Sequence, residues 1–197
     1  MREVEVKAVV RDWEEVRRRL HAAGARPVFA GTLEDRRYDS ADRSMGARDE
    51  LLRVRVMRDG GRARVELGWK GPTGYRDGYK VREEIQTLAD DPDALVTIVE
   101  RLGFVLVQQI DREIEQFELH GATVRLERYP RMDDLVEVEG APDAIERAVS
   151  ALGIARAEFT SERLPAFVRR YEQRTGERAA LSGGELSGTT HVDLDDA

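Results

Sequence analysis

The feature that most constrains this fold is an alternation of charged and apolar residues at the start of the chain. In the segment Glu3-Val4-Glu5-Val6-Lys7 the charged side chains occupy every second position. Because successive side chains of a β-strand point to opposite faces, these charges share one face and the valines share the other. A half-buried strand of the ordinary kind turns such charges toward water.

The same alternation recurs in several later segments, with charges of both signs. The charged positions are Arg53, Arg55, Arg64, Glu66, Lys70, Lys80, Arg82, Glu84, Arg125, Glu127, Glu137 and Glu139. If helices cover the apolar faces, the charged faces curl inward, which predicts an α+β fold: a closed antiparallel β-barrel with a charged lumen and helices packed outside. Buried charges need partners, so we expect a ligand with many negative oxygens, and metal ions that neutralise carboxylates.

Local patterns predict the elements of this barrel. After the first strand, the predicted strands span residues 28–39, 51–58, 62–70, 79–88, 104–119, 122–129 and 135–140. The predicted helices follow residue 12, follow residues 90–93, and span 142–152 and 161–174. Residues 40–50 are rich in Ser, Asp, Arg and Gly and predict a loop.

Composition excludes several classes of function. The formal net charge of −7 argues against general nucleic-acid binding, which needs a basic surface. The absence of cysteine excludes disulfides, thiolate catalysis and a cysteine zinc site. No apolar run approaches the roughly 18 residues of a membrane helix, so we expect a soluble cytoplasmic protein without membrane partners. The oligomeric state stays open, a homodimer included.

The motifs together resemble the CYTH domain, or triphosphate tunnel metalloenzyme, family. Its members include class IV adenylyl cyclases, thiamine triphosphatases and inorganic triphosphatases. The matching motifs are Glu3-x-Glu5-x-Lys7, then LLRVR, WKGP, KVREE and LVEVE, in the family's order. The resemblance covers residues 1–175, which we expect to form one CYTH domain. Residues 176–197 are Gly/Ser-rich and acidic and predict a flexible tail.

The resemblance implies that two pairs of glutamates hold Mg²⁺ or Mn²⁺. The predicted metal ligands are Glu3, Glu5, Glu137 and Glu139. Hard carboxylate oxygens suit these ions, and positions i and i+2 of a strand present two carboxylates side by side. The alternative is that these glutamates form structural ion pairs with facing arginines.

The basic residues on the same faces are predicted to bind a triphosphate or nucleoside triphosphate substrate. They are Lys7, Arg53, Arg55, Arg64, Lys70, Lys80, Arg82, Arg112 and Arg125. Arginine forks bind phosphoryl oxygens in two places, and lysine acts as a compact point charge. Because phosphoryl transfer builds charge on these oxygens, the positive field with its metal is also the catalyst. The predicted catalytic residues are Lys7, Arg55, Lys70 and Glu127.

The sequence departs from the family's pattern at four positions. Arg37 stands where an aromatic residue is usual, and Ile114 stands where a base is common. Glu127 replaces a usual aspartate, and Asp133 replaces a frequent glycine. By strand parity Arg125 shares a face with Glu127, so it could restore the missing base.

Three functions compete on the sequence alone. In a class IV adenylyl cyclase the ribose 3′-hydroxyl of ATP attacks the α-phosphorus and pyrophosphate leaves. In a triphosphatase a metal-positioned water attacks the terminal phosphorus of inorganic triphosphate, thiamine triphosphate or a nucleotide. A non-catalytic tunnel would bind a nucleotide or polyphosphate as a sensor. The motifs look most like the cyclase-type branch, which makes the first reaction the leading hypothesis.

Overall fold

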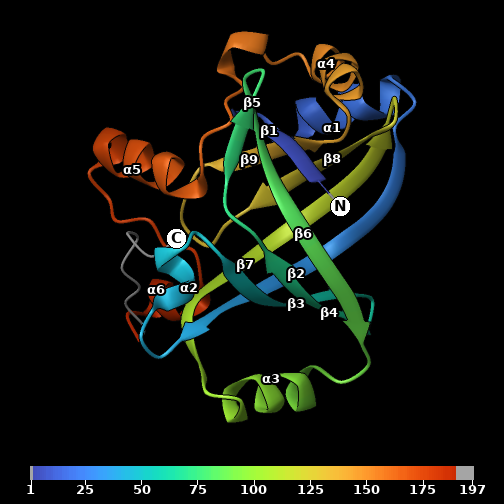
Figure 1. The fold of residues 1–197 in the computed structure, drawn as a ribbon. Coiled ribbons are helices and arrows are strands. Elements are labelled where there is room, and N and C mark those ends of the chain that lie inside the picture. Colours follow the sequence, from blue (N-terminus) through green and yellow to red (C-terminus); the bar gives the residue numbers. More distant parts are fainter. Residues whose placement is uncertain (1, 190–197) are drawn as a thin grey trace.

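A computed structural model describes the backbone of residues 2–189 and the side chains of residues 4–189 (Figure 1). Its strands are β1 (Arg2–Val10), β2 (Arg26–Ser40), β3 (Leu51–Asp59), β4 (Arg62–Lys70), β5 (Gly74–Arg76), β6 (Tyr79–Ala89), β7 (Phe104–Leu119), β8 (Ala122–Arg128) and β9 (Asp134–Glu139). Its helices are α1 (Trp13–Ala22), α2 (Ser44–Ala47), α3 (Pro92–Arg101), α4 (Pro142–Ala151), the 3₁₀ helix η1 (Arg156–Glu158), α5 (Leu164–Thr175) and α6 (Gly183–Ser187). Within residues 2–189, no helix is long and apolar enough to span a membrane.

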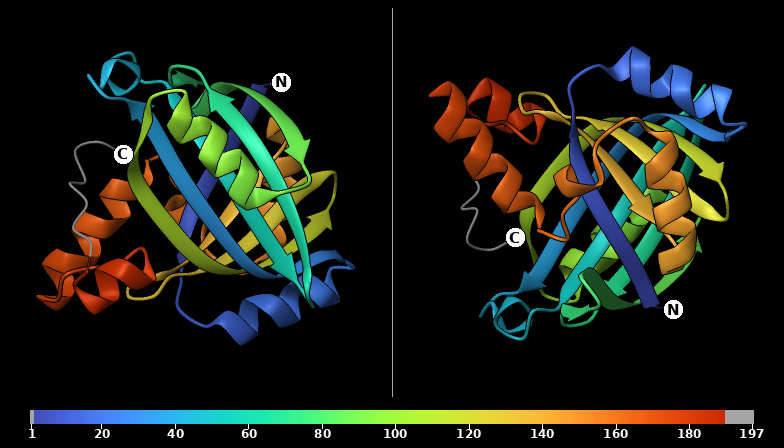
Figure 2. Two further views of the ribbon diagram at one scale, coloured as in Figure 1. Left: turned by 90° about the horizontal axis from the view of Figure 1, so that it is seen from below. Right: turned by 90° about the horizontal axis from the view of Figure 1, so that it is seen from above.

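Eight strands form a closed antiparallel barrel in the order β1-β9-β8-β7-β2-β3-β4-β6, and pairing of β6 with β1 closes the ring. The short β5 pairs with the start of β6. The helices lie outside the barrel wall, as the two views of Figure 2 show. The predicted α+β barrel with outer helices is therefore confirmed.

The hydrophobic core lies between the barrel wall and the helices. Alternate residues of β1, β8 and β9 pack against α1 and α4, and a second cluster joins β3 and β4 to α3. Val54 of β3, for example, is fully buried in the same cluster as Val99 of α3. Because each strand gives its apolar face to this outer core, its charged face points into the lumen.

Local signals set the ends of these elements. The side chain of Asp12 accepts a hydrogen bond from the backbone N–H of Glu15 at 3.0 Å and so begins α1. Asp91 caps α3 in the same way. Gly60 and Gly61 take positive φ angles of 51° and 93°, which permits the tight turn between β3 and β4.

The segment after α5 differs from the prediction of a flexible tail. Residues 179–182 are buried, and Leu181 packs in an apolar cluster shared with α5. The Leu181 carbonyl accepts a hydrogen bond from the backbone N–H of Asp111 at 2.8 Å, and a capping box at Ser182 begins α6. The buried residues 179–182 thus differ from the predicted flexible tail, which otherwise stays a prediction. Residues 190–197, which complete the predicted tail, lie outside the described residues.

Candidate active site

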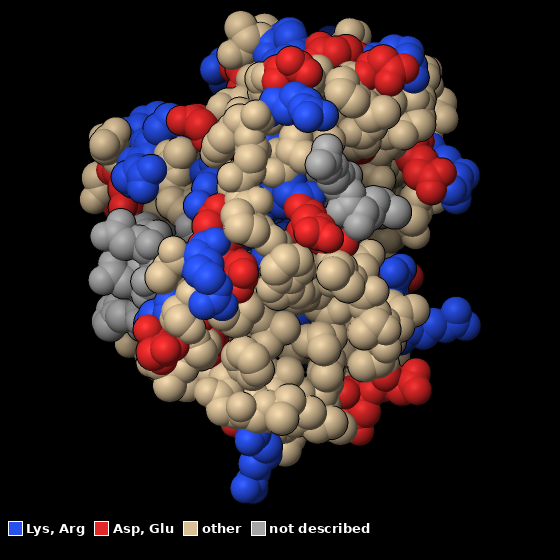
Figure 3. All heavy atoms as spheres, in the orientation of Figure 1, with Lys and Arg blue, Asp and Glu red and all other residues tan. Residues whose placement is uncertain are grey.

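A cavity of about 730 Å³ occupies the lumen and reaches the rim formed by the α2 loop and the start of α5. Its described lining carries twelve basic and nine acidic side chains, a surplus of three positive charges, although the whole chain has a formal charge of −7. Figure 3 shows that charged side chains of both signs gather over the upper part of this face, whereas the lower part is mostly uncharged.

The strands bring nearly all predicted site residues to this one cavity. The lining includes Glu5, Lys7, Arg53, Arg55, Arg64, Lys70, Lys80, Arg82, Arg112, Arg125, Glu137 and Glu139. Two predicted residues are not part of this list. The side chain of Glu3 lies outside the described residues, and Glu127 lies deeper in the wall.

Lys7 joins the two acidic strands at one side of the cavity. Its Nζ lies 2.7 Å from Glu5 Oε1 and 2.7 Å from Glu137 Oε2. Lys80 Nζ lies 2.5 Å from the same Glu5 oxygen. Although burial opposes the charged form, Glu137 and Glu5 hold the pKa of Lys7 well above its ordinary value. Both acids therefore already compensate bases before a ligand binds.

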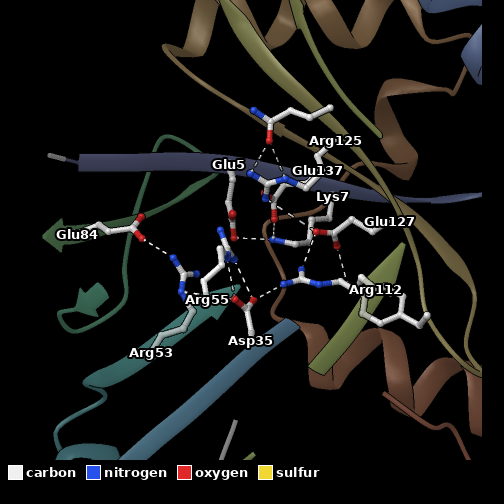
Figure 4. Close-up of polar contacts among 12 residues, drawn as sticks. Glu5, Lys7, Asp35, Arg53, Arg55, Glu84, Arg112, Arg125, Glu127 and Glu137 are labelled. Atoms are coloured by element: carbon white, nitrogen blue, oxygen red, sulfur yellow. Dashed lines mark hydrogen bonds and ion pairs between the residues drawn. The ribbon is translucent and has the colours of Figure 1, made fainter. Parts of the chain in front are cut away.

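Asp35 of β2 is the centre of a second cluster (Figure 4). Arg55 binds it through two nitrogens: Nε donates to Oδ1 at 2.7 Å and Nη2 donates to Oδ2 at 2.9 Å. Arg112 Nη2 donates to Oδ2, and Arg53 Nε lies 3.7 Å from Oδ1. Burial opposes the charge of Asp35, but these three arginines hold the pKa of its carboxyl well below the usual range. The carboxylate thus fixes arginines from two neighbouring strands.

Glu127 contacts the Asp35 cluster through Arg112. It is fully buried and accepts hydrogen bonds from Arg112 Nη1 at 2.7 Å and from the Tyr129 hydroxyl at 2.6 Å. Burial, followed by the Glu127 charge, raises the pKa of Tyr129 well above its ordinary value. Glu127 is not among the residues that line the cavity, but its partners Arg112 and Tyr129 are. The catalytic role of Glu127 stays a prediction, and its contacts with Arg112 and Tyr129 also suit a positioning role.

The departure at Ile114 has a structural counterpart inside the barrel. Ile114 is 2% exposed and packs with Leu33 and Met57 in a small apolar cluster. Arg125 shares the lumen face with Glu127, as strand parity predicted, and its Nη1 donates to Glu137 Oε1 at 2.6 Å. Ile114 therefore gives the barrel wall an apolar contact where a base was expected, and Arg125 supplies a base beside Glu137.

Two of the residues predicted to bind triphosphate contact groups at the rim of the cavity or near its surface. Arg82 donates from Nε to the Gly71 carbonyl and from Nη2 to the Asp49 carbonyl, both at 2.7 Å, and so joins two loops at the rim. Arg64 has a side chain 60% exposed and lies 2.9 Å from Glu66. Arg82 is thus buried at the rim, whereas Arg64 is largely exposed.

Sequence reasoning missed several lining residues on β2. Asp35, Arg37 and Asp39 alternate on the lumen face, and all three line the cavity. Asp39 accepts hydrogen bonds from the backbone N–H groups of Met45 at 3.0 Å and Gly46 at 2.9 Å, which holds α2 at the rim. The charges of these three residues follow the period-two pattern of a strand with a charged lumen face. Charged residues on the opposite face of β2 obscured this pattern in the sequence.

The donor set suits a divalent metal ion held partly by its substrate. Glu5 and Glu139 are cross-strand partners, and Glu137 is the next lumen residue along β9. Among the described residues, no three His, Cys, Asp or Glu side chains converge as a complete metal cage. Mg²⁺ commonly uses one or two carboxylates and takes its other ligands from water and substrate phosphates. One or two of Glu5, Glu137 and Glu139 therefore suit such an ion, and the side chain of Glu3 is not described.

Comparison with known proteins agrees with this geometry. The CYTH domain family matches residues 1–160. A "putative adenylate cyclase" of Methanocaldococcus jannaschii is 27% identical over 166 residues, which cover 79% of this chain and 92% of the relative.

Solved structures show the same fold. One is a "putative adenylate cyclase" from Vibrio parahaemolyticus (TM-score 0.71, 16% identity, 85% of this chain and 97% of that one). Another is a protein from Pyrococcus horikoshii (TM-score 0.69, 24% identity, 89% and 99%). A third, from Hippeastrum, is titled a putative adenylyl cyclase that reveals a dominant triphosphatase activity (TM-score 0.55, 14% identity, 96% and 97%). Because the family model matches residues 1–160, the chain belongs to the CYTH domain family.

Proposed function

We propose that this protein is a divalent-metal-dependent enzyme that binds the triphosphate group of its substrate in the barrel lumen. The observation that carries the proposal is the surplus of basic side chains around a lumen cavity of about 730 Å³. A single phosphate offers too little charge to engage bases that come from β1, β3, β4, β6, β7 and β8. A triphosphate spans several of them at once.

The ion pairs prepare these bases for catalysis. Asp35 holds Arg53 and Arg55 in place, and Glu137 holds Lys7, so little reorganisation is needed when negative charge develops on phosphoryl oxygens. Glu5, Glu137 and Glu139 would hold the metal ion, which would neutralise phosphate charge and polarise the reacting group. Lys7, Arg55 and Lys70 are the side chains for which we propose direct contact with the reacting phosphate chain.

The first proposed reaction is the cyclisation of ATP, in which the 3′-oxygen bonds to the α-phosphorus as the bond to pyrophosphate breaks. It is supported by the likeness of the motifs to class IV cyclases and by the name of the archaeal relative. The second candidate is hydrolysis of the terminal phosphate. It is favoured by the cavity lining, because Tyr129 is the aromatic residue among the described lining residues and its hydroxyl is committed to Glu127. Such a lining offers much to a phosphate chain and little stacking to a base.

One incubation separates these candidates. The purified protein is mixed with Mg²⁺ or Mn²⁺ and either ATP or inorganic triphosphate, and the products are resolved by chromatography. Cyclic AMP with pyrophosphate identifies the cyclase. ADP with phosphate, or pyrophosphate with phosphate from triphosphate, identifies the hydrolase. Tight binding without turnover of either compound would contradict an enzyme and leave a sensor, and full turnover in excess chelator would contradict the metal requirement.

A further inference from the structure

Arg37 differs from the other arginines deep in the cavity, because its guanidinium has no carboxylate partner. It lies on the lumen face of β2 between Asp35 and Asp39 and pairs across the sheet with Arg53 of β3 and Gln108 of β7. Its Nη1 donates to Gln108 Oε1 at 2.8 Å. Among the described residues, no carboxylate lies within ion-pair distance of Arg37.

The surrounding corner has more hydrogen-bond donors than acceptors. Arg37 Nε and Gln108 Nε2 are buried and have no hydrogen-bond partner within residues 4–189. Gln108 itself is 1% exposed, so its amide reaches no bulk water that could compensate. Buried polar groups are normally satisfied, and the ligand that would satisfy a surplus of donors is one rich in acceptor oxygens.

The charge of Arg37 is also uncompensated. The pKa of Arg37 is lowered to about 10, chiefly by burial; Asp35 opposes this shift, and the positive charges of Arg112 and Arg53 add to it. At neutral pH the side chain remains protonated. Arg37 is therefore a cation that gains an ionic partner when an anion binds. Arg55 and Arg112, in contrast, already bind carboxylates and would have to divide their donors between these and the ligand.

We propose that Arg37, oriented by the Gln108 amide, binds a phosphoryl group of the substrate at the α2 end of the lumen and strengthens selection of polyphosphates. This inference rests on the proposed function. The position is marked by Asp39, two residues further along β2, which holds the backbone of α2. A guanidinium fork matches two phosphoryl oxygens, so Arg37 and its neighbour Arg53 can contact one phosphate chain from adjacent strands.

The test is a calorimetric titration of the full-length protein with inorganic triphosphate, with and without Mg²⁺. Arg37→Gln should raise the dissociation constant about tenfold, and Arg37→Lys should recover part of the loss. Arg36→Gln is the matched control, because Arg36 points to the other face of the same strand and pairs with Glu34 at 2.6 Å. We expect the control to bind as the wild type does.

A second readout separates binding from structure. Because no carboxylate lies within ion-pair distance of Arg37 among the described residues, Arg37→Gln should melt without ligand at or above the wild-type temperature, and only its triphosphate-induced shift should shrink. Wild-type affinity in Arg37→Gln would overturn the inference, and so would a ligand-free loss of stability that accounts for the weaker binding. If the wild type itself bound no triphosphate, the proposed function would fail, which is a different outcome from equal binding by both proteins.

Discussion

Replacing Asp35 by asparagine removes a carboxylate that Arg53, Arg55 and Arg112 share inside the barrel. The shape of the side chain is kept, but three buried guanidinium groups lose their common counter-charge. Removing one partner of a buried ion pair costs about 3 to 5 kcal/mol of stability. For a chain of 197 residues this corresponds to a fall in melting temperature of about 6 to 20 °C.

The assay is thermal unfolding followed by circular dichroism across a pH series. Asp35 has a lowered pKa in the folded state, so its contribution is present above its unfolded pKa of about 3.9 and is lost as the pH falls through the folded pKa. The gap in melting temperature between wild type and Asp35→Asn should therefore be full near neutral pH. It should begin to narrow below about pH 4 and close only as the pH passes the lower folded pKa of Asp35. Triphosphate should raise the melting temperature of the variant more than that of the wild type, because the ligand replaces the missing negative charge.

The matched control is Asp134→Asn, which breaks the half-exposed pair with Arg128 at 2.8 Å. A pair at the surface contributes under about 1 kcal/mol, so the control should melt close to the wild type at every pH. If Asp35→Asn cost no more stability than Asp134→Asn, the arginines of the lumen would not depend on Asp35, and the account of a prepared positive field would be refuted.

Three further changes test other parts of the structure. Glu137→Gln should abolish metal-dependent turnover while the circular dichroism spectrum stays native, and unchanged turnover would argue against its metal role. Arg55→Ala should weaken triphosphate binding at least about tenfold in a titration, whereas Val54→Asp should fail to fold because it buries a charge beneath α3. If Val54→Asp folded and Arg55→Ala still bound triphosphate normally, the charged face of β3 would be the outer one. Arg82→Ala should speed limited proteolysis in the two rim loops whose carbonyls it binds, and an unchanged cleavage pattern would show that these loops are held by other contacts.

The barrel could be predicted from the sequence because its charges alternate with apolar residues over whole strands. Val54 between Arg53 and Arg55 shows why: one face must enter the core under a helix, so the other face must enter the lumen. The same parity predicts that Arg125 shares the lumen face with Glu127, and in the structure Arg125 also binds Glu137 of the neighbouring strand. Period-two patterning thus determined both the fold and most of the cavity lining.

The partners of these charges could not be predicted in the same way. Parity places Glu127 on the lumen face, but only the packing of Arg112 and Tyr129 shows that it lies behind the cavity wall. The burial of Leu181 was missed for a similar reason, since a single apolar residue in a polar segment gives no period, and its docking depends on the cluster beneath α5. Contacts between residues distant in sequence decide both cases.

The central claim is that the charged lumen binds a triphosphate together with a divalent ion. A crystal structure of the protein grown with inorganic triphosphate and Mn²⁺ tests it most directly, with the metal located by its anomalous scattering. We expect phosphate density within hydrogen-bond distance of Lys7, Arg53 and Arg55, and a manganese peak beside Glu137 and Glu139. Triphosphate on the outer surface with an empty lumen, or a lumen phosphate chain without manganese near these glutamates, would contradict the account.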